Sequence, residues 1–340
     1  FQVGENPEVA VAVVGPAGIR FLDLESTVSL EATFGRGVVQ LADPGQTISI
    51  VIGDETLTAT TESEDAALAY EVIHRRSLGD DPLIEQNHRT EVVLTSVAGS
   101  LAISGSDTQF ELSPGSQATI ALSDANAPPP EPKTPLMLPT WVDPEVETGS
   151  LESEAAESLL ELVRSEGSDS LVLSLRVALG FRRNEVAALA GMSMLSFSDA
   201  SAYFGVDGLL SKSRQRLYWS KHLDALREMV DRSVQDAAAV RTAIAGENVE
   251  MDHADGDTLF RLIVGYSQDQ LKVGGDEELV SDLESVSMPV RVLASETLRD
   301  ICGTTLYFKP EEEVANRREE VVKKWKARLR NEPIRYPEGE

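Results

Sequence analysis

The sequence predicts an antiparallel β-sandwich-like domain over residues 1–126, followed by an α-solenoid over residues 146–335. Three observations predict this order. Short apolar runs and turn residues alternate through the first domain, as in β-sandwiches. The apolar period then changes from two to about 3.6, which is the helical period. Between them, Ala127–Pro144 holds seven of the chain's 16 prolines, so residues 127–145 are expected to form a semi-rigid extended linker.

Length and charge narrow the range of functions. The 340 residues are 41% hydrophobic, which is enough for real cores. The net charge is −27, with 6 basic and 23 acidic residues in 1–150 and 24 basic and 34 acidic residues in 151–340. Both parts would repel a polyanion, so nucleic acid and anionic lipid surfaces are poor partners. The single cysteine, Cys302, excludes an intrachain disulfide and a cysteine metal cluster.

Strands are expected wherever apolar residues alternate with polar ones. Ile48, Ile50 and Ile52 would face one side of a sheet, with Thr47, Ser49 and Val51 on the other. The polar stretch Arg75–Arg89 is expected to be a long loop. The predicted strands are 9–14, 19–24, 28–32, 38–41, 48–52, 57–60, 67–73, 91–97, 101–104, 109–112 and 118–122.

The end of this domain carries a recognisable pattern of apolar residues and glycines. It comprises Val92–Leu94, Gly99, Leu101, Ile103, Phe110, Leu112, Gly115, Gln117 and Ile120. The pattern resembles the closing half of a FecR-type domain, with Ser116 as an extra residue between Gly115 and Gln117. The resemblance implies a β-rich extracytoplasmic domain. Such domains commonly follow a membrane helix in proteins that relay a surface signal or hold a sigma factor inactive.

A cupin is the enzyme-bearing alternative for these strands. It would need a His-x-His pair and a nearby glutamate as metal ligands. This part of the chain has only His74 and His88, at the two ends of the polar loop. His74 is therefore interpreted as an ordinary residue at the loop's edge.

Helices are expected from residue 150 onward. Pro289 suits a first helical turn and Gly303 a helix end, while Asn184, Asp257 and Asp276 are candidate N-caps. The long helix from Lys212 to Arg232 would turn Leu217, Leu223, Leu226 and Val230 inward. The other predicted helices are 150–165, 171–180, 185–192, 199–204, 234–245, 310–330 and those that begin near 257, 276 and 289.

One of these segments resembles a HEAT-type repeat. Met288–Ala294 (MPVRVLA) followed by Leu298 and Ile301 is the best match, and Glu185–Ala190 is a weaker copy. The resemblance implies that Arg291 braces a turn between helices. Ile301–Trp325 and Arg214–Trp219 are similar to parts of HEAT-like modules in large bacterial envelope proteins of unknown function. The resemblance implies a scaffold and no activity.

Three aromatic residues are candidates for contact with a partner. Tyr218 and Trp219 could be interface anchors, because aromatic residues are enriched at interfaces, although a solenoid core also uses them. Trp141 could pin the proline-rich linker to either domain or contact a ligand.

The sequence contains no assembled set of reactive residues. In Glu250–Asp257, an EF-hand register centred on Gly256 puts Met251 first and Leu262 twelfth, so the calcium pattern fails. Neither a phosphate loop nor a Gly-x-Ser-x-Gly elbow is present. A helix-turn-helix interpretation of residues 184–207 lacks the basic residues that would contact phosphate. We therefore expect no catalytic residues, no cofactor and no metal.

These observations favour a non-catalytic, extracytoplasmic interaction or scaffold module of a membrane-anchored bacterial protein. Its partner would be a protein or a cell-wall component, and its setting envelope signalling of the sigma and anti-sigma type. Membrane attachment is expected only through a segment upstream of Phe1. A hydrolase with carboxylates brought together at the domain interface is the alternative.

Overall fold

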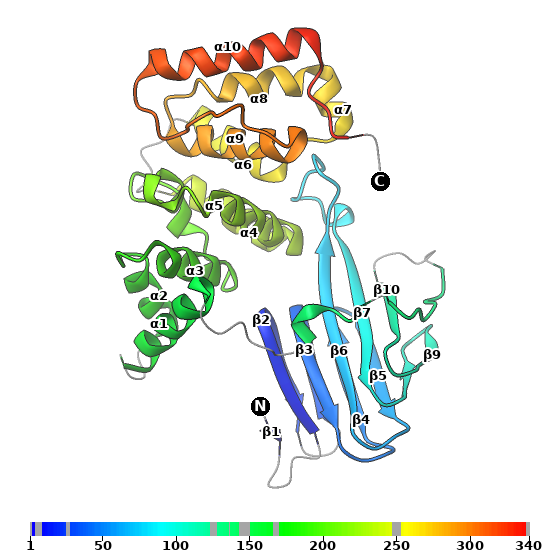
Figure 1. Ribbon diagram of the computed structural model, residues 1–340. Coiled ribbons are helices and arrows are strands. Elements are labelled where there is room, and N and C mark those ends of the chain that lie inside the picture. The colour runs from blue at the N-terminus through cyan, green and yellow to red at the C-terminus, as the bar shows by residue number, and fades with distance from the viewer. Residues whose placement is uncertain are drawn as a thin grey trace. The chain divides into compact units, whose positions relative to one another are not determined.

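A computed structural model describes residues 2–3, 9–24, 28–122, 128–135, 137–142, 150–165, 170–246 and 253–337 (Figure 1). The chain divides into two compact units. One comprises residues 1–75 and 88–146, and the other comprises residues 76–87 and 147–340. The first is built of strands and the second mainly of helices, so the predicted order of β structure before α structure is confirmed.

In the part of the chain that the structure describes, the strands of the β unit form one mixed sheet in the order β10-β7-β6-β3-β4-β5-β8-β9, with β2 also pairing β3 and β1 pairing β2. The strands are β1 (Gln2–Val3), β2 (Val9–Asp23), β3 (Val28–Leu41), β4 (Thr47–Ile52), β5 (Glu55–Thr61), β6 (Ala66–Arg75), β7 (Arg89–Ala98), β8 (Leu101–Ser104), β9 (Gln109–Leu112) and β10 (Gln117–Ala121).

Strand β3 is the element that connects the two parts of this sheet. Residues 28–31 pair in parallel with β4, and residues 35–41 pair antiparallel with β6. The expectation of a wholly antiparallel arrangement is therefore corrected at one pair. The physical reason is that the runs 28–32 and 38–41 form one strand, which offers the same edge to two different neighbours. Runs 9–14 and 19–24 likewise belong to β2, with Gly15 at φ +71° and a shift of register after Val14.

The core of the β unit follows the predicted alternation. Ile48, Ile50 and Ile52 are buried in one cluster with residues from the other strands. Burial of each such isoleucine side chain contributes about 1.5–3 kcal/mol to the free energy of folding. Gly37 lets Tyr70 lie across β3, since a Cβ at this position would be 2.5 Å from the tyrosine oxygen.

The helical unit contains two hydrophobic clusters, one within its first three helices and a larger one through the rest. Helix α9 packs against α4, α6 and α8, and α8 against α10 (Figure 1). The helices are α1 (Leu151–Ser165), α2 (Leu171–Ala178), α3 (Asn184–Leu195), α4 (Trp219–Arg232), α5 (Val234–Ile244), α6 (His253–Val264), α7 (Gln268–Gln270), α8 (Asp276–Asp282), α9 (Met288–Cys302) and α10 (Ala315–Asn331).

The ends of α9 were predicted correctly from the sequence. Pro289 lies in its first turn and Gly303 ends it at φ +69°. Arg291 of this helix donates hydrogen bonds to the carbonyls of Ser285, Val286 and Pro310. It thereby joins the turn before α9 to the segment that precedes α10.

Several other helix starts were predicted wrongly. The long helix begins at Trp219 rather than Lys212, and Leu217 lies in the preceding turn, where it is 87% exposed instead of inward. Asn184 and Asp276 are the first residues of their helices rather than the caps before them. Asp257 lies inside α6. Shifts of one or two residues, as at Asn184 and Asp276, lie within the usual spread of helix boundaries, whereas the start of α4 is displaced by seven residues.

The described part of the predicted linker has little regular structure. Lys133 and Gln117 exchange two backbone hydrogen bonds of 2.8 Å, and Thr140–Val142 form a 3-10 turn. Residues 127, 136 and 143–145 lie outside the described residues. Within the described chain, no helix combines the length and apolar character needed to cross a bilayer.

Candidate functional site

The connection between β6 and β7 is an ordered part of the helical unit. Residues 76–87, here called the docked loop, group with the helices. The loop includes the 3-10 turn Glu85–Asn87. The sequence predicted a long loop here, and the structure adds that this loop packs on helices more than a hundred residues away along the chain.

Arg76 is the centre of this docking. Its side chain is 0% exposed, and its Nε lies 3.0 Å from Oδ1 of Asp231 on α4. Nη1 donates to the carbonyls of Ser77 (3.0 Å) and Asp80 (2.7 Å), and Nη2 to that of Val264 (3.0 Å). All three guanidinium nitrogens therefore have an acceptor, which a buried arginine requires.

The contact with Val264 also completes the end of a helix. Val264 is the last residue of α6, and its carbonyl is one of those without a partner inside the helix. A positive charge is favourable at this negative end of the helix dipole. Gly265 follows at φ +83°, and a Cβ there would come within 2.9 Å of Leu78 in the docked loop.

Gly79 makes the second polar contact. Its carbonyl accepts a hydrogen bond of 2.9 Å from Nε2 of Gln270 on α7. Oε1 of Gln270 accepts from the amide of Ser267, whose hydroxyl accepts from the amide of Gln270, so the two form a capping box. Gly79 has φ +85°, and a Cβ there would be 2.1 Å from Oε1 of Gln270. The position admits glycine alone without rearrangement.

The docked loop is also ordered internally. The carboxylate of Asp81 accepts a hydrogen bond of 2.9 Å from the amide of Leu83, and its carbonyl accepts one of 2.8 Å from Asn87. Leu83 packs against the large helical cluster. The loop therefore presents one buried charge and one apolar side chain from a framework of short-range hydrogen bonds.

The sequence contained a partial signal for this loop. Arg76 is one of only six basic residues in 1–150, and Gly79, Asp81 and Pro82 follow it closely. Such turn residues indicate defined backbone conformations. The partner, Asp231, is 155 positions away, and no pattern in a single sequence pairs the two.

The three predicted interaction residues have different surroundings. Trp219 is only 1% exposed and belongs to the helical core, while Tyr218 beside it is half-buried at the start of α4. Trp141 is half-buried in the β unit, where the guanidinium carbon of Arg36 lies 5.6 Å from the centre of its ring. Tyr218 and Trp141 therefore retain exposed surface that a partner could contact.

His222 on α4 belongs to a buried hydrogen-bonded group that also includes Gln215 and the carbonyl of Asn184. Nε2 of His222 lies 3.2 Å from Oε1 of Gln215, and Nε2 of Gln215 donates to the carbonyl of Asn184. Because the amide nitrogen of Gln215 is the donor to Asn184, its oxygen accepts from the protonated Nε2 of His222. Burial lowers the pKa of His222 to about 3, so the imidazole is neutral. The ring of Tyr203 meets it edge-on, with centroids 5.2 Å apart.

Carboxylates gather where α4 faces α9. Burial raises the pKa of Glu296 to about 7, and the nearby Asp300 and Asp224 act in the same direction. Arg299 forms an ion pair with Glu296, and Arg227 pairs with Asp300 at 2.7 Å. Clustered carboxylates with raised pKa values are typical of acid–base sites. Here Arg299 offsets only part of the effect of burial on Glu296, whose side chain is 7% exposed between the packed helices.

The other candidate groups form no metal centre. His74 lies in β6, where its two ring nitrogens meet the hydroxyl of Thr90 (3.1 Å) and the carbonyl of Thr33 (2.6 Å). Among the described residues, no group of three or more His, Cys, Asp or Glu side chains is placed to hold a metal ion. In Glu250–Asp257, residues 250–252 lie outside the described part. Burial raises the pKa of the Cys302 thiol, which disfavours the reactive thiolate.

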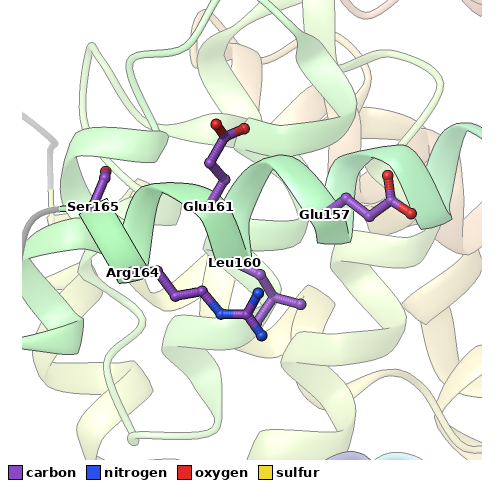
Figure 2. A pocket seen from close by; sticks show the side chains of 5 residues that line it. All are labelled: Glu157, Leu160, Glu161, Arg164 and Ser165. Carbon is purple, nitrogen blue, oxygen red and sulfur yellow. The ribbon is translucent and has the colours of Figure 1, made fainter.

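A shallow, open depression lies on α1 (Figure 2). It is lined by Glu157, Leu160, Glu161, Arg164 and Ser165, all from this one helix. A site for a small molecule normally encloses most of its ligand and draws on several elements. The depression therefore has the character of a solvated helix face.

Comparisons with known proteins do not assign the chain to a family. No family model matches the chain, and no curated protein matches it. Two crystal structures of a proposed anti-sigma factor from Parabacteroides distasonis are similar to parts of it. At 13% and 9% identity, they cover 39% and 37% of this chain, each with a TM-score of 0.23. The chain spans 58% and 60% of the length of these proteins.

Proposed function

We propose that this chain is a non-catalytic interaction and scaffold module, which acts outside the cytoplasm as part of a membrane-anchored bacterial protein. Its partner is a protein or a cell-wall component. Envelope signalling of the sigma and anti-sigma type is the setting that the FecR-like pattern of residues 92–120 implies. The finer fold assignments, a FecR-like β-sandwich and a HEAT-like solenoid, belong to the same proposal.

The docked loop is the observation that carries this proposal. The helical unit buries Arg76, and the loop that bears it continues directly into β6 and β7. The chain thus passes between the two units after residues 75, 87 and 146. Three covalent chain passages between the two units suit a protein whose task is to connect two recognition surfaces.

The half-buried aromatic residues supply the candidate contacts. Tyrosine and tryptophan offer a large apolar area with few rotatable bonds, which makes them efficient anchors. Tyr218 of the helical unit and Trp141 of the β unit are both of this kind. Trp219 is buried, and its substitution would be expected to unfold the core rather than to remove a contact.

Site-specific cross-linking in the bacterium that encodes the chain tests the proposal. A photoreactive amino acid replaces Tyr218 in the full-length protein, and a matched protein carries it at Tyr307, which is 89% exposed. We expect a discrete cross-linked protein or glycan from position 218 that position 307 does not give. A β-lactamase fusion, active only outside the cytoplasm, reports the location. A cytoplasmic location, or identical products from both positions, would contradict the proposal.

A further inference from the structure

A second segment docks close to the loop. Residues 333–337, here called the C-terminal strap, follow α10. Ile334 is 1% exposed and belongs to the large helical cluster. Nη1 of Arg335 lies 2.6 Å from Oδ2 of Asp276. The amide of Tyr336 donates to Oε1 of Gln268 at 3.1 Å. Apolar packing of Ile334 and Tyr336, one ion pair and one hydrogen bond from a backbone amide to a side chain therefore hold the strap.

The docked loop and the strap contact the same short stretch, residues 264–276, here called the joint. The loop contacts the carbonyl of Val264 and the side chain of Gln270. The strap contacts Gln268 and Asp276. Gln268 and Gln270 are the first and last residues of α7, so one helix of three residues carries a contact from each segment.

The joint contains a kinked helical stretch. Residues 268–275 are helical, but Val273 and Gly274 leave helical geometry, with Gly274 at φ +115°. Burial of Tyr266 and Leu271 in the large helical cluster, the capping box of Ser267 and Gln270, and the contacts with the loop and the strap together hold this interrupted stretch.

This arrangement makes the two dockings interdependent. Both segments contact the ordered joint in addition to their other contacts within the helical unit, so each docking carries part of the conformational cost of ordering it. When one is already docked, that cost has been met and the other docks more readily, which is positive cooperativity. The coupling requires no direct contact between the loop and the strap.

We infer that the joint couples the C-terminal strap to the docked loop, so that release of the strap loosens the loop and release of the loop loosens the strap. The inference does not depend on the proposed function, since it concerns only contacts within the helical unit.

Hydrogen exchange of the full chain tests the coupling. Arg335→Ala removes the ion pair of the strap, and Arg330→Ala, at an exposed position on α10, is the matched control. We expect Arg335→Ala to speed exchange of the amides in 77–86 about five-fold or more, and Arg330→Ala to leave it unchanged. Gln268→Ala, which removes only the bond to Tyr336, should act in the same direction by a smaller factor.

The reciprocal experiment makes the test decisive. Asp231→Asn removes the charge partner of Arg76, and it should speed exchange of the amides of 334–336. Exchange should rise in both directions, because coupling between two bindings is reciprocal. Peptides from 290–300, in the middle of α9, report general loosening. An unchanged loop in Arg335→Ala, an effect in one direction only, or an equal rise in 290–300 would overturn the inference.

Discussion

Arg76 shows how one side chain can define a docking site. A buried guanidinium is costly unless every nitrogen finds an acceptor. Here one carboxylate and three carbonyls provide them, and two of those carbonyls belong to the docked loop itself. The docked loop therefore supplies two of the four acceptors around Arg76 and the helices supply the other two. These hydrogen bonds fix the position of the loop on the helices.

Gly79→Ala is expected to destabilise the protein more than Gly303→Ala does. Both glycines have positive φ, but a Cβ at Gly79 would meet Gln270 while that at Gly303 would meet open space. Gly303→Ala should cost about 1–2 kcal/mol for the left-handed backbone alone. Gly79→Ala should cost at least about 1 kcal/mol more. Urea unfolding of both variants measures the difference, and equal costs would argue against close packing at Gly79.

His222 should remain neutral far below the usual pH range of histidine. Burial holds its pKa near 3, and the bond to Gln215 places the proton on Nε2. Nitrogen-15 NMR of the imidazole at pH 5 should show a protonated Nε2 and an unprotonated Nδ1. The signals of the other three histidines, His74, His88 and His253, provide the comparison. A protonated His222 at that pH would show that water reaches the ring.

Because His222 has a lowered pKa, the unfolded state binds its proton first as the pH falls. Its contribution to stability is therefore present above about pH 6.5 and is lost as the pH falls toward 3. This loss should be missing from a His222→Gln variant.

At the scale of elements, sequence patterns predicted whether a segment is a strand or a helix far better than they predicted where an element begins and which segments join into one. The strand runs and the ends of α9 followed from alternation, Pro289 and Gly303. The continuity of β3 did not, because two short runs look alike whether they form one strand or two. The start of α4 was predicted wrongly because Leu217 has the spacing of an inward-facing helical residue, although it lies in a turn and is exposed to solvent. Three aromatic candidates came from the sequence, yet their burial, which distinguishes them, is a tertiary property.

The packing of α4 against α9 should make the free energy of unfolding fall as the pH rises from about 4.5 to 7. Glu296 has a folded pKa of about 7, raised from 4.5. The folded state therefore keeps its proton over a range where the unfolded state has lost it, and stability declines between about pH 4.5 and 7. Glu296→Gln removes that decline and should be more stable than the wild type at pH 8, by up to about 3 kcal/mol, but not at pH 4.5.

Chemical unfolding at both pH values measures this effect. Glu320→Gln, at an exposed position on α10, controls for the general loss of one negative charge from a chain of net charge −27. An equal gain in both variants would assign the effect to overall repulsion instead of to Glu296.

At the scale of the whole molecule, the central claim is that the helical unit includes residues 76–87. A division of the chain at the proline-rich linker, as the sequence suggested, would leave Asp231 and the carbonyl of Val264 without Arg76. Three of the chain's structural features then depend on a loop encoded within the β region: the end of α6, the contact with Gln270 and the packing of Leu83.

Unfolding of Arg76→Ala beside its neighbour Arg75→Ala tests that claim most directly. Arg75 forms an exposed ion pair with Glu91, at 61% exposure, and its loss should cost less than about 1 kcal/mol. Loss of the buried Arg76 should cost about 3–5 kcal/mol in the transition of the helical unit, followed by the fluorescence of the buried Trp219 and Trp325. Similar, small losses in both variants would contradict the account.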